Sequence, residues 1–323
     1  MNVLSTSDRS RCFPVLRSVL IELGGMLMLA VSAVGMWAWT PDRSRIELDR
    51  KYGGPFTRYV EVGGTSLRVR DTGPKDAPVL VLIHGFGSSL ETWTPWAQSL
   101  STTYRVVRFD LPGCGLSEPD RTGNYGDARS VALTSELMGS MGIAKATLVG
   151  NSMGGRIAWR FAAAFPDRTR KLVLISPDGF ARPGFQYGKA PQVPEFMQLM
   201  KYFLPRTLMR MNLETAYADP ERLSDSVVDR YYDLLLAPGN RGASIERMRQ
   251  SVLEDPVPLL RQIRARTLLL WGKKDRLIPH ANAAEFLASL PNATLVTFPD
   301  LGHVPQEEAP AESLAPLETF LAR

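Results

Sequence analysis

The sequence has few cysteines, no concentrated charge and no repeats. Its 323 residues include two cysteines, Cys12 and Cys114, in unlike contexts, so no disulfide framework is expected. The net charge of +5 is diffuse, and residues 183–262 carry ten Lys or Arg against ten Asp or Glu. No basic run is interleaved with aromatic residues, which argues against a nucleic-acid partner. Internal repeats and low-complexity segments are missing, and an apolar share of 44% excludes gross disorder and fibrous architectures.

The first 54 residues have the pattern of a targeting segment and not of a folded domain. A basic segment at 1–17 precedes an apolar block at 18–39, which only Glu22 interrupts, and a charged linker follows at 40–54. The 22 residues of the block are enough to cross a bilayer as a helix. We therefore expect a single N-terminal membrane anchor, with either orientation open because basic residues flank both ends.

Two other interpretations of the block stay open. A cleaved secretory signal would use the small residues of Ala30–Ala33 and would leave a secreted or periplasmic protein. The block is longer than the usual apolar core of such signals, about 7 to 15 residues, which favours the uncleaved anchor. A buried core helix is the third interpretation, and the lack of a polar stripe disfavours it.

From Pro55 onward, short β-branched runs alternate with helical patterns, which predicts an α/β fold with a mostly parallel eight-stranded sheet covered by helices on both faces. The first two strands, separated by Gly63 and Gly64, read as an antiparallel hairpin. The predicted strands are Arg58–Val62, Ser66–Asp71, Val79–Ile83, Arg105–Phe109, Ala146–Val149, Leu172–Ile175, Leu268–Trp271 and Thr294–Phe298.

One interval departs from this alternation. Residues 183–262 contain helical stretches and prolines but no convincing strand. We interpret them as a helical cap inserted after the sixth strand, between two parts of one catalytic core at 55–182 and 263–323. Predicted core helices are Asp127–Met141, Gly154–Phe165, Ala281–Leu290 and Pro310–Leu321.

The sequence Gly150-Asn151-Ser152-Met153-Gly154 fits the G-x-S-x-G pattern between a predicted strand and a predicted helix. Strand, turn and helix in that order are typical of a nucleophile elbow, in which small neighbours let the serine project from the sheet edge. Ser152 is therefore the candidate nucleophile.

A second glycine-rich turn, His84-Gly85-Phe86-Gly87, follows the strand at Val79–Ile83. Its backbone can aim the Phe86 N–H at the oxygen of a tetrahedral intermediate, together with the N–H of Met153. We expect His84 to fix this turn through backbone hydrogen bonds, and the nearby Trp93 and Trp96 to be packing residues.

Asp275 and His303 each follow one of the last two predicted strands, where open α/β sheets place their sites. A serine hydroxyl needs a base, and the base needs a carboxylate to hold its tautomer. Of the three histidines, His280 stands outside any motif. His303 is therefore the candidate base and Asp275 the candidate acid.

Five ordered motifs, HGFG, DLPGCGLS, GNSMGG, WGKKDRLIP and LGH, together resemble the landmarks of the α/β-hydrolase superfamily from Pro55 to Arg323. The resemblance implies a Ser152–His303–Asp275 triad, an oxyanion hole formed by the Phe86 and Met153 amides, and no metal or organic cofactor. Asp178, just after the sixth strand, is a fallback acid because some members of the superfamily draw the acid from there.

Within the superfamily, the elbow and cap resemble both membrane-anchored monoacylglycerol-lipase-like esterases and C–C hydrolases of meta-ring-fission products. The C–C branch usually has an HGSGPG-type turn and a Trp after the histidine. This chain has Phe86, Ser88 and Ser89 in the turn, and Val304 after His303. These departures favour a serine esterase that cleaves a hydrophobic carboxylic ester, such as a monoacylglycerol, with C–C hydrolysis as the alternative. A non-enzymatic binding protein is a more distant one.

The cap contains an apolar set that can line an acyl pocket or simply pack its helices. The set comprises Phe196, Met197, Leu199, Met200, Phe203, Leu204, Leu208, Met209 and Met211. Expected partners are a small hydrophobic ester and, through the anchor, a membrane. The oligomeric state is not predicted.

Overall fold

The computed structural model describes residues 21–26, 28 and 39–323. The basic segment 1–17 and most of the apolar block 18–39 lie outside this part of the chain. Within the described part, we find no helix that combines the length and the apolar character needed to cross a bilayer. The anchor and the cleaved signal therefore both stay predictions from the sequence.

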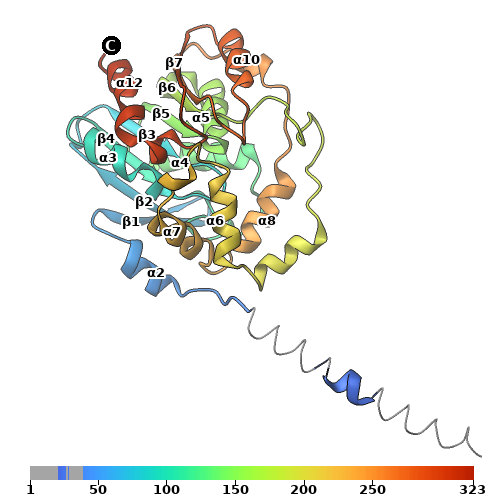
Figure 1. The fold of residues 1–323 in the computed structure, drawn as a ribbon. Helices are drawn as coiled ribbons and strands as arrows, with labels where there is room; N and C mark the ends of the chain where they lie inside the picture. Colours follow the sequence, from blue (N-terminus) through green and yellow to red (C-terminus); the bar gives the residue numbers. More distant parts are fainter. Residues whose placement is uncertain (1–20, 27, 29–38) are drawn as a thin grey trace, which may run out of the picture.

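Eight strands form one sheet in the order β1-β2-β4-β3-β5-β6-β7-β8 (Figure 1). β1 pairs with β2 and β2 with β4 in antiparallel fashion, and all the other neighbours are parallel. This confirms the predicted fold class, including the hairpin. The strands are β1 Thr57–Val62, β2 Thr65–Thr72, β3 Val79–Ile83, β4 Arg105–Phe109, β5 Ala146–Asn151, β6 Thr169–Ile175, β7 Arg266–Gly272 and β8 Ala293–Phe298.

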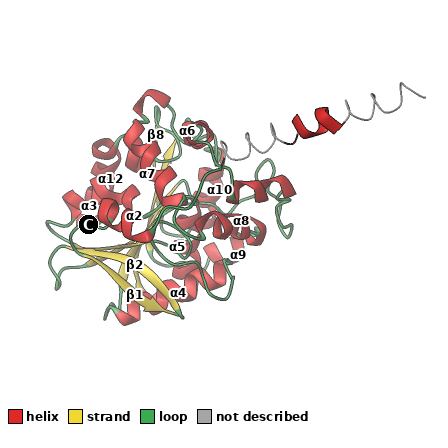
Figure 2. Cartoon of the chain, turned by 90° about the horizontal axis from the view of Figure 1, so that it is seen from below, coloured by secondary structure: helices red, strands yellow, loops and turns green. Residues whose placement is uncertain are grey.

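Helices cover both faces of the sheet because its central strands are apolar on both sides (Figure 2). In β3, Leu80 and Leu82 point into one core and Val81 and Ile83 into the other. The first core contains α3 (Thr94–Leu100) and α12 (Pro310–Ala322), with Trp93 and Trp96 fully buried, as expected for packing residues. The second contains α4 (Asp127–Ser140), α5 (Met153–Ala164), α9 (Val257–Leu260) and α10 (Ala281–Ser289).

The interval between β6 and β7, interpreted above as the cap, is built from helical elements. One apolar cluster joins it to the core, because Tyr217 and Val228 pack with Val304, the residue after His303. The cap elements are η3 Glu195–Lys201, α6 Arg206–Glu214, η4 Pro220–Arg222, α7 Asp225–Leu235 and α8 Asn240–Gln250. Shorter core elements are η1 Leu90–Trp93, η2 Pro166–Arg168 and α11 Pro305–Glu308.

Residues 40–54, predicted as a linker, instead contain a helix that packs on the domain: α2, Arg45–Tyr52 (Figure 1). Leu48 is its buried residue and lies against Leu116 and Leu234, while Lys51 forms a 2.8 Å ion pair with Asp233 of α7. The sequence pattern misses α2 because a helix held by one buried apolar side chain and by polar contacts shows no apolar periodicity.

Candidate active site

The turn between β5 and α5 holds Ser152 in a strained conformation, with φ +56° and ψ −120°. The turn is tight because its glycines allow backbone segments to approach closely. A Cβ atom on Gly154 would overlap the carbonyl oxygen of Ile83, and a Cβ atom on Gly150 would overlap the carbonyl oxygen of Gly154. The Ser152 N–H donates to the carbonyl of Ile175 at 2.9 Å. The serine thus stands at the carboxyl edge of the sheet, at the start of α5.

Asp275 and His303 meet in the loops after β7 and β8. Nδ1 of His303 lies 2.8 Å from Oδ2 of Asp275, and both residues are buried. The other carboxylate oxygen, Oδ1, accepts the N–H groups of Leu277 at 2.8 Å and Ile278 at 2.9 Å. Burial opposes ionisation of Asp275 and by itself would raise the pKa of the carboxyl group. The charge and hydrogen bond of His303, together with the Ile278 amide, outweigh burial, so the pKa of Asp275 is lowered. Asp275 is therefore a carboxylate that can hold the Nδ1–H tautomer.

Asp178, the fallback acid, is engaged by arginines instead. Its Oδ2 lies 3.1 Å from Nη1 of Arg156, and its Oδ1 pairs with Arg182. Arg156 is itself buried and also pairs with Asp127 at 3.0 Å. Asp178 borders the same cavity as His303, but its carboxylate contacts favour a structural role over that of the triad acid.

His84 fixes the glycine-rich turn after β3, as predicted. Its Nδ1 lies 2.8 Å from the carbonyl of Gly85, and its Nε2 accepts the N–H of Leu111 at 3.0 Å. Complete burial lowers the pKa of His84. Because both ring nitrogens are engaged with backbone groups and the ring is closed off from the cavity, His84 is not a candidate base. The turn lies close to the elbow, because a Cβ on Gly85 would come within 3.3 Å of the Ser152 Cβ.

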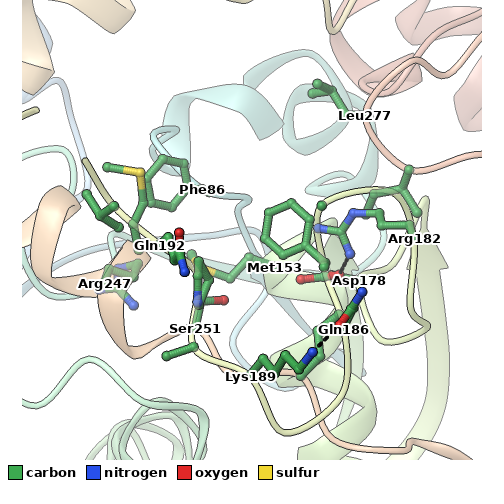
Figure 3. A pocket seen from close by; sticks show the side chains of 18 of the residues that line it. Phe86, Met153, Asp178, Arg182, Gln186, Lys189, Gln192, Arg247, Ser251 and Leu277 are labelled. Atoms are coloured by element: carbon green, nitrogen blue, oxygen red, sulfur yellow. Dashed lines mark hydrogen bonds and ion pairs between the residues drawn. The ribbon is translucent and has the colours of Figure 1, made fainter.

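One cavity of about 740 Å³ brings the candidate residues together. Figure 3 shows part of its wall, including Phe86 and Met153. Ser152, Met153, Phe86 and His303 all line it, whereas Asp275 stands behind His303 and does not. Most of the remaining wall is apolar and comes from the cap and from the loop after β7. These residues include Phe185, Pro191, Val193, Pro194, Met197, Met248, Leu253, Leu277 and Ile278.

The predicted acyl-pocket set in the cap has a different location. Of its nine members, only Met197 is among the residues that line the cavity. Leu204 is buried, whereas Phe196, Leu199 and Met211 are more than half exposed. Neither alternative, pocket lining or helix packing, describes the whole set. Met197 lines the cavity and Leu204 and Met209 pack inward, whereas the exposed members are Phe196, Leu199, Phe203, Leu208 and Met211.

Polar residues to which the sequence analysis gave no role connect the loops that carry the candidate residues. Asn151 Nδ2 donates to the carbonyls of Ile175 at 3.1 Å and His303 at 3.0 Å, joining the elbow to the histidine loop. Glu307 of α11 accepts from Arg230 at 2.7 Å and from the Tyr231 hydroxyl at 2.8 Å, both from α7. Only the position of Asn151, beside the nucleophile, was visible as a signal in the sequence.

Positive charge borders the cavity, where Arg182, Lys189 and Arg247 are among its lining residues. Figure 3 shows Arg182 beside Asp178 on one wall and Arg247 near Gln192 and Ser251 on another. In the described part of the chain, no cluster of three or more His, Cys, Asp or Glu residues is arranged to hold a metal ion.

Comparisons with known proteins agree with this architecture. A 2-hydroxy-6-oxononadienedioate/2-hydroxy-6-oxononatrienedioate hydrolase from Paraburkholderia phymatum is 32% identical over 78% of this chain and 91% of its own length. A crystal structure of a membrane phospholipase A, described as a bacterial virulence factor, matches with a TM-score of 0.70 at 24% identity, covering 97% of this chain and 98% of the other. A meta-cleavage product hydrolase from Pseudomonas fluorescens IP01 matches with a TM-score of 0.71 at 23% identity, covering 82% and 97%.

At these identities the two solved structures establish similarity of fold alone. The model of the alpha/beta hydrolase fold family matches residues 78–310, which span the elbow, the cap and both loops that meet at His303. This chain belongs to the α/β-hydrolase family.

Proposed function

We propose that the protein is a serine hydrolase that works through an acyl-enzyme intermediate. The observation that most supports this is the 2.8 Å contact between His303 Nδ1 and Asp275 Oδ2, formed beside a cavity that Ser152 also lines. A base with a fixed tautomer next to a serine in a strained turn is the arrangement that activates a hydroxyl for nucleophilic attack.

In the proposed reaction, Ser152 Oγ attacks the substrate carbonyl while Nε2 of His303 takes the hydroxyl proton. Asp275 stabilises the resulting imidazolium, and the Phe86 and Met153 amides donate to the oxyanion. His303 then protonates the leaving group, which departs and leaves Ser152 acylated. Water deprotonated by His303 cleaves the acyl-enzyme and restores the serine.

We propose a carboxylic ester with a hydrophobic acyl group as the substrate. The cavity supports this because side chains such as Val193, Met197 and Leu253 supply an apolar wall beside Ser152. Arg247 and Lys189 add positive charge at the same cavity, which suits an ester that also carries a polar or anionic group.

C–C hydrolysis is the second candidate, and the comparisons with relatives favour it over ester hydrolysis. The Paraburkholderia phymatum relative cited above is named as a hydrolase of a 2-hydroxy-6-oxo dienedioate. In such a reaction the bond beside a ketone breaks, and the leaving carbon must receive a proton, whereas an ester leaves as an alcohol protonated on oxygen. The same serine and histidine can act in either reaction, so the two reactions differ in the leaving group and not in these residues.

Paired assays test both candidates. A panel of esters of increasing acyl length measures ester hydrolysis, and loss of the absorbance of a coloured ring-fission dienoate measures C–C hydrolysis. We expect the higher kcat/KM on the longer esters; a higher kcat/KM on the dienoate would reverse the assignment. Ser152→Ala should abolish turnover and labelling by a fluorophosphonate probe, whereas Ser251→Ala, which alters another serine of the cavity, should keep the label.

A further inference from the structure

Exposed apolar side chains gather at the start of the cap. Phe196 and Leu199 of η3 are 67% and 62% exposed, and Met211 of α6 is 64% exposed. Isolated exposed apolar residues are ordinary, but several that follow one another along a short stretch of chain indicate a contact surface. We call this group the cap apolar surface; it consists of Trp39, Phe196, Leu199, Tyr202, Phe203, Leu208 and Met211.

Two members of this surface, Leu208 and Met211, are turned away from the side of α6 that packs on the domain. The other side of α6 already packs inward, because Met209 and Leu213 lie against the cluster that contains Tyr217 and Val228. Leu208 and Met211 face outward from the same helix, with 52% and 64% of their surface exposed. Helix α6 is thus apolar on two sides, and the apolar residues of one side are more than half exposed.

The apolar block of the sequence ends at this surface. Trp39 is the last residue of the block, and its ring stacks on Tyr202 with centroids 5.6 Å apart. The next residue, Thr40, donates its N–H to the Tyr202 carbonyl at 2.8 Å, and Arg241 of α8 donates to the Thr40 carbonyl at 2.8 Å. In Figure 1 the blue chain beginning at Trp39 accordingly lies beside the yellow-green segment of η3.

The same stretch also forms the edge of the cavity. Pro191, Val193 and Pro194 lead into η3 and line the cavity, as does Met197 within η3. One short helix therefore presents Met197 to the cavity that holds Ser152, while its neighbours Phe196 and Leu199 are exposed.

We propose that the cap apolar surface rests on a lipid bilayer, so that a hydrophobic substrate passes from the bilayer across η3 into the cavity. A bilayer is favoured over a second copy of the chain because Trp39 fixes the end of a membrane-length apolar block to this surface. A bilayer entered by that block must lie beside η3, and Trp and Tyr are the side chains preferred at such an interface. The contact rests on the predicted anchor, whereas the passage of substrate also rests on the proposed function.

Site-specific fluorescence tests the contact without relying on activity. In the full chain carrying Cys12→Ser, an environment-sensitive fluorophore is attached at Leu199→Cys or, as a matched control, at Leu287→Cys. Leu287 is 40% exposed on α10, at the opposite end of the domain in Figure 1, and the remaining Cys114 is buried. With phosphatidylcholine vesicles, and with vesicles that also contain phosphatidylglycerol, we expect a blue shift at 199 and none at 287.

Kinetics then test the passage of substrate. For Phe196→Ser with Leu199→Ser, we expect hydrolysis of a vesicle-embedded ester to fall about tenfold, because two apolar contacts with lipid are lost. Turnover of a water-soluble short ester should be unchanged, and Leu287→Ser should change neither rate. Equal losses on both esters would overturn the passage.

Two fluorescence results would overturn the bilayer contact. One is the absence of a blue shift at 199 with vesicles. The other is a shift without vesicles that grows with protein concentration, which would mean that a second copy covers the surface. If neither ester is hydrolysed by the unmodified chain, the proposed function fails, and the fluorescence still decides the contact.

Discussion

Replacing Asp275 with asparagine should decide between the two candidate acids, Asp275 and Asp178. The introduced amide side chain can keep the position of the carboxylate, because its oxygen still accepts the Leu277 and Ile278 amides that Oδ1 accepts at 2.8 and 2.9 Å. Its NH₂ group would then face Nδ1 of His303 across the 2.8 Å contact. Two N–H donors cannot share a hydrogen bond, so the ring would move its proton to Nε2 and lose the lone pair that receives the serine proton.

The expected loss is large because the change removes the base and not merely a contact. In a serine protease triad, the same substitution with intact geometry lowers kcat about 10⁴-fold, or about 5.5 kcal/mol in activation free energy. We expect a similar loss here. Asp178→Asn is the matched control: it weakens the ion pairs to Arg156 and Arg182 and should cost about 3 kcal/mol of stability while kcat stays within a few-fold of the unsubstituted protein.

Steady-state kinetics on one substrate, together with urea unfolding of both variants, provide the measurement. The reasoning is refuted if Asp275→Asn keeps more than about a tenth of kcat, since a tautomer error cannot be so mild. It is also refuted if Asp178→Asn, still folded, loses as much activity as Asp275→Asn. That outcome would assign the acid to Asp178.

Three further predictions concern stability. Burial lowers the pKa of His84 in the folded protein below its ordinary value near 6.5. As pH falls, this histidine is therefore protonated in the unfolded chain before it is protonated in the folded one. The free energy of unfolding should then drop by up to about 1.4 kcal/mol per pH unit below pH 6.5. His84→Gln should remove that part of the slope in urea titrations at pH 7 and 5.5; an identical slope would contradict it. Tyr231→Phe should lower the free energy of unfolding by about 1.5–3 kcal/mol, because the Glu307 carboxylate loses a partly buried 2.8 Å hydrogen bond. An unchanged urea midpoint would argue against that contact. Gly154→Ala should cost about 1–3 kcal/mol or more, as thermal unfolding can measure, because its Cβ would overlap the Ile83 carbonyl; wild-type stability would disprove that close approach.

Much of the core could be predicted because its signals are local in the sequence. Val79–Ile83 and Arg105–Phe109 have the predicted bounds, since apolar runs bounded by turn residues mark strands buried on both faces. The candidate site followed from the same logic. Once the strands are placed, their carboxyl ends share one edge of the sheet, so Ser152, Asp275 and His303 were expected together before any contact was known.

The tertiary structure decided what depends on surfaces meeting across the chain. Helix α2 exists because Leu48 and Lys51 find partners near residue 233, which no local pattern reveals. The same holds for Asp178, whose engagement depends on two arginines. It also holds for the cap residues Phe196 and Leu199, for which the sequence left pocket lining and helix packing open and which are exposed instead. Apolar periodicity shows that a side chain seeks a partner, but only the assembled fold determines whether that partner is the core, the substrate cavity or something outside the molecule.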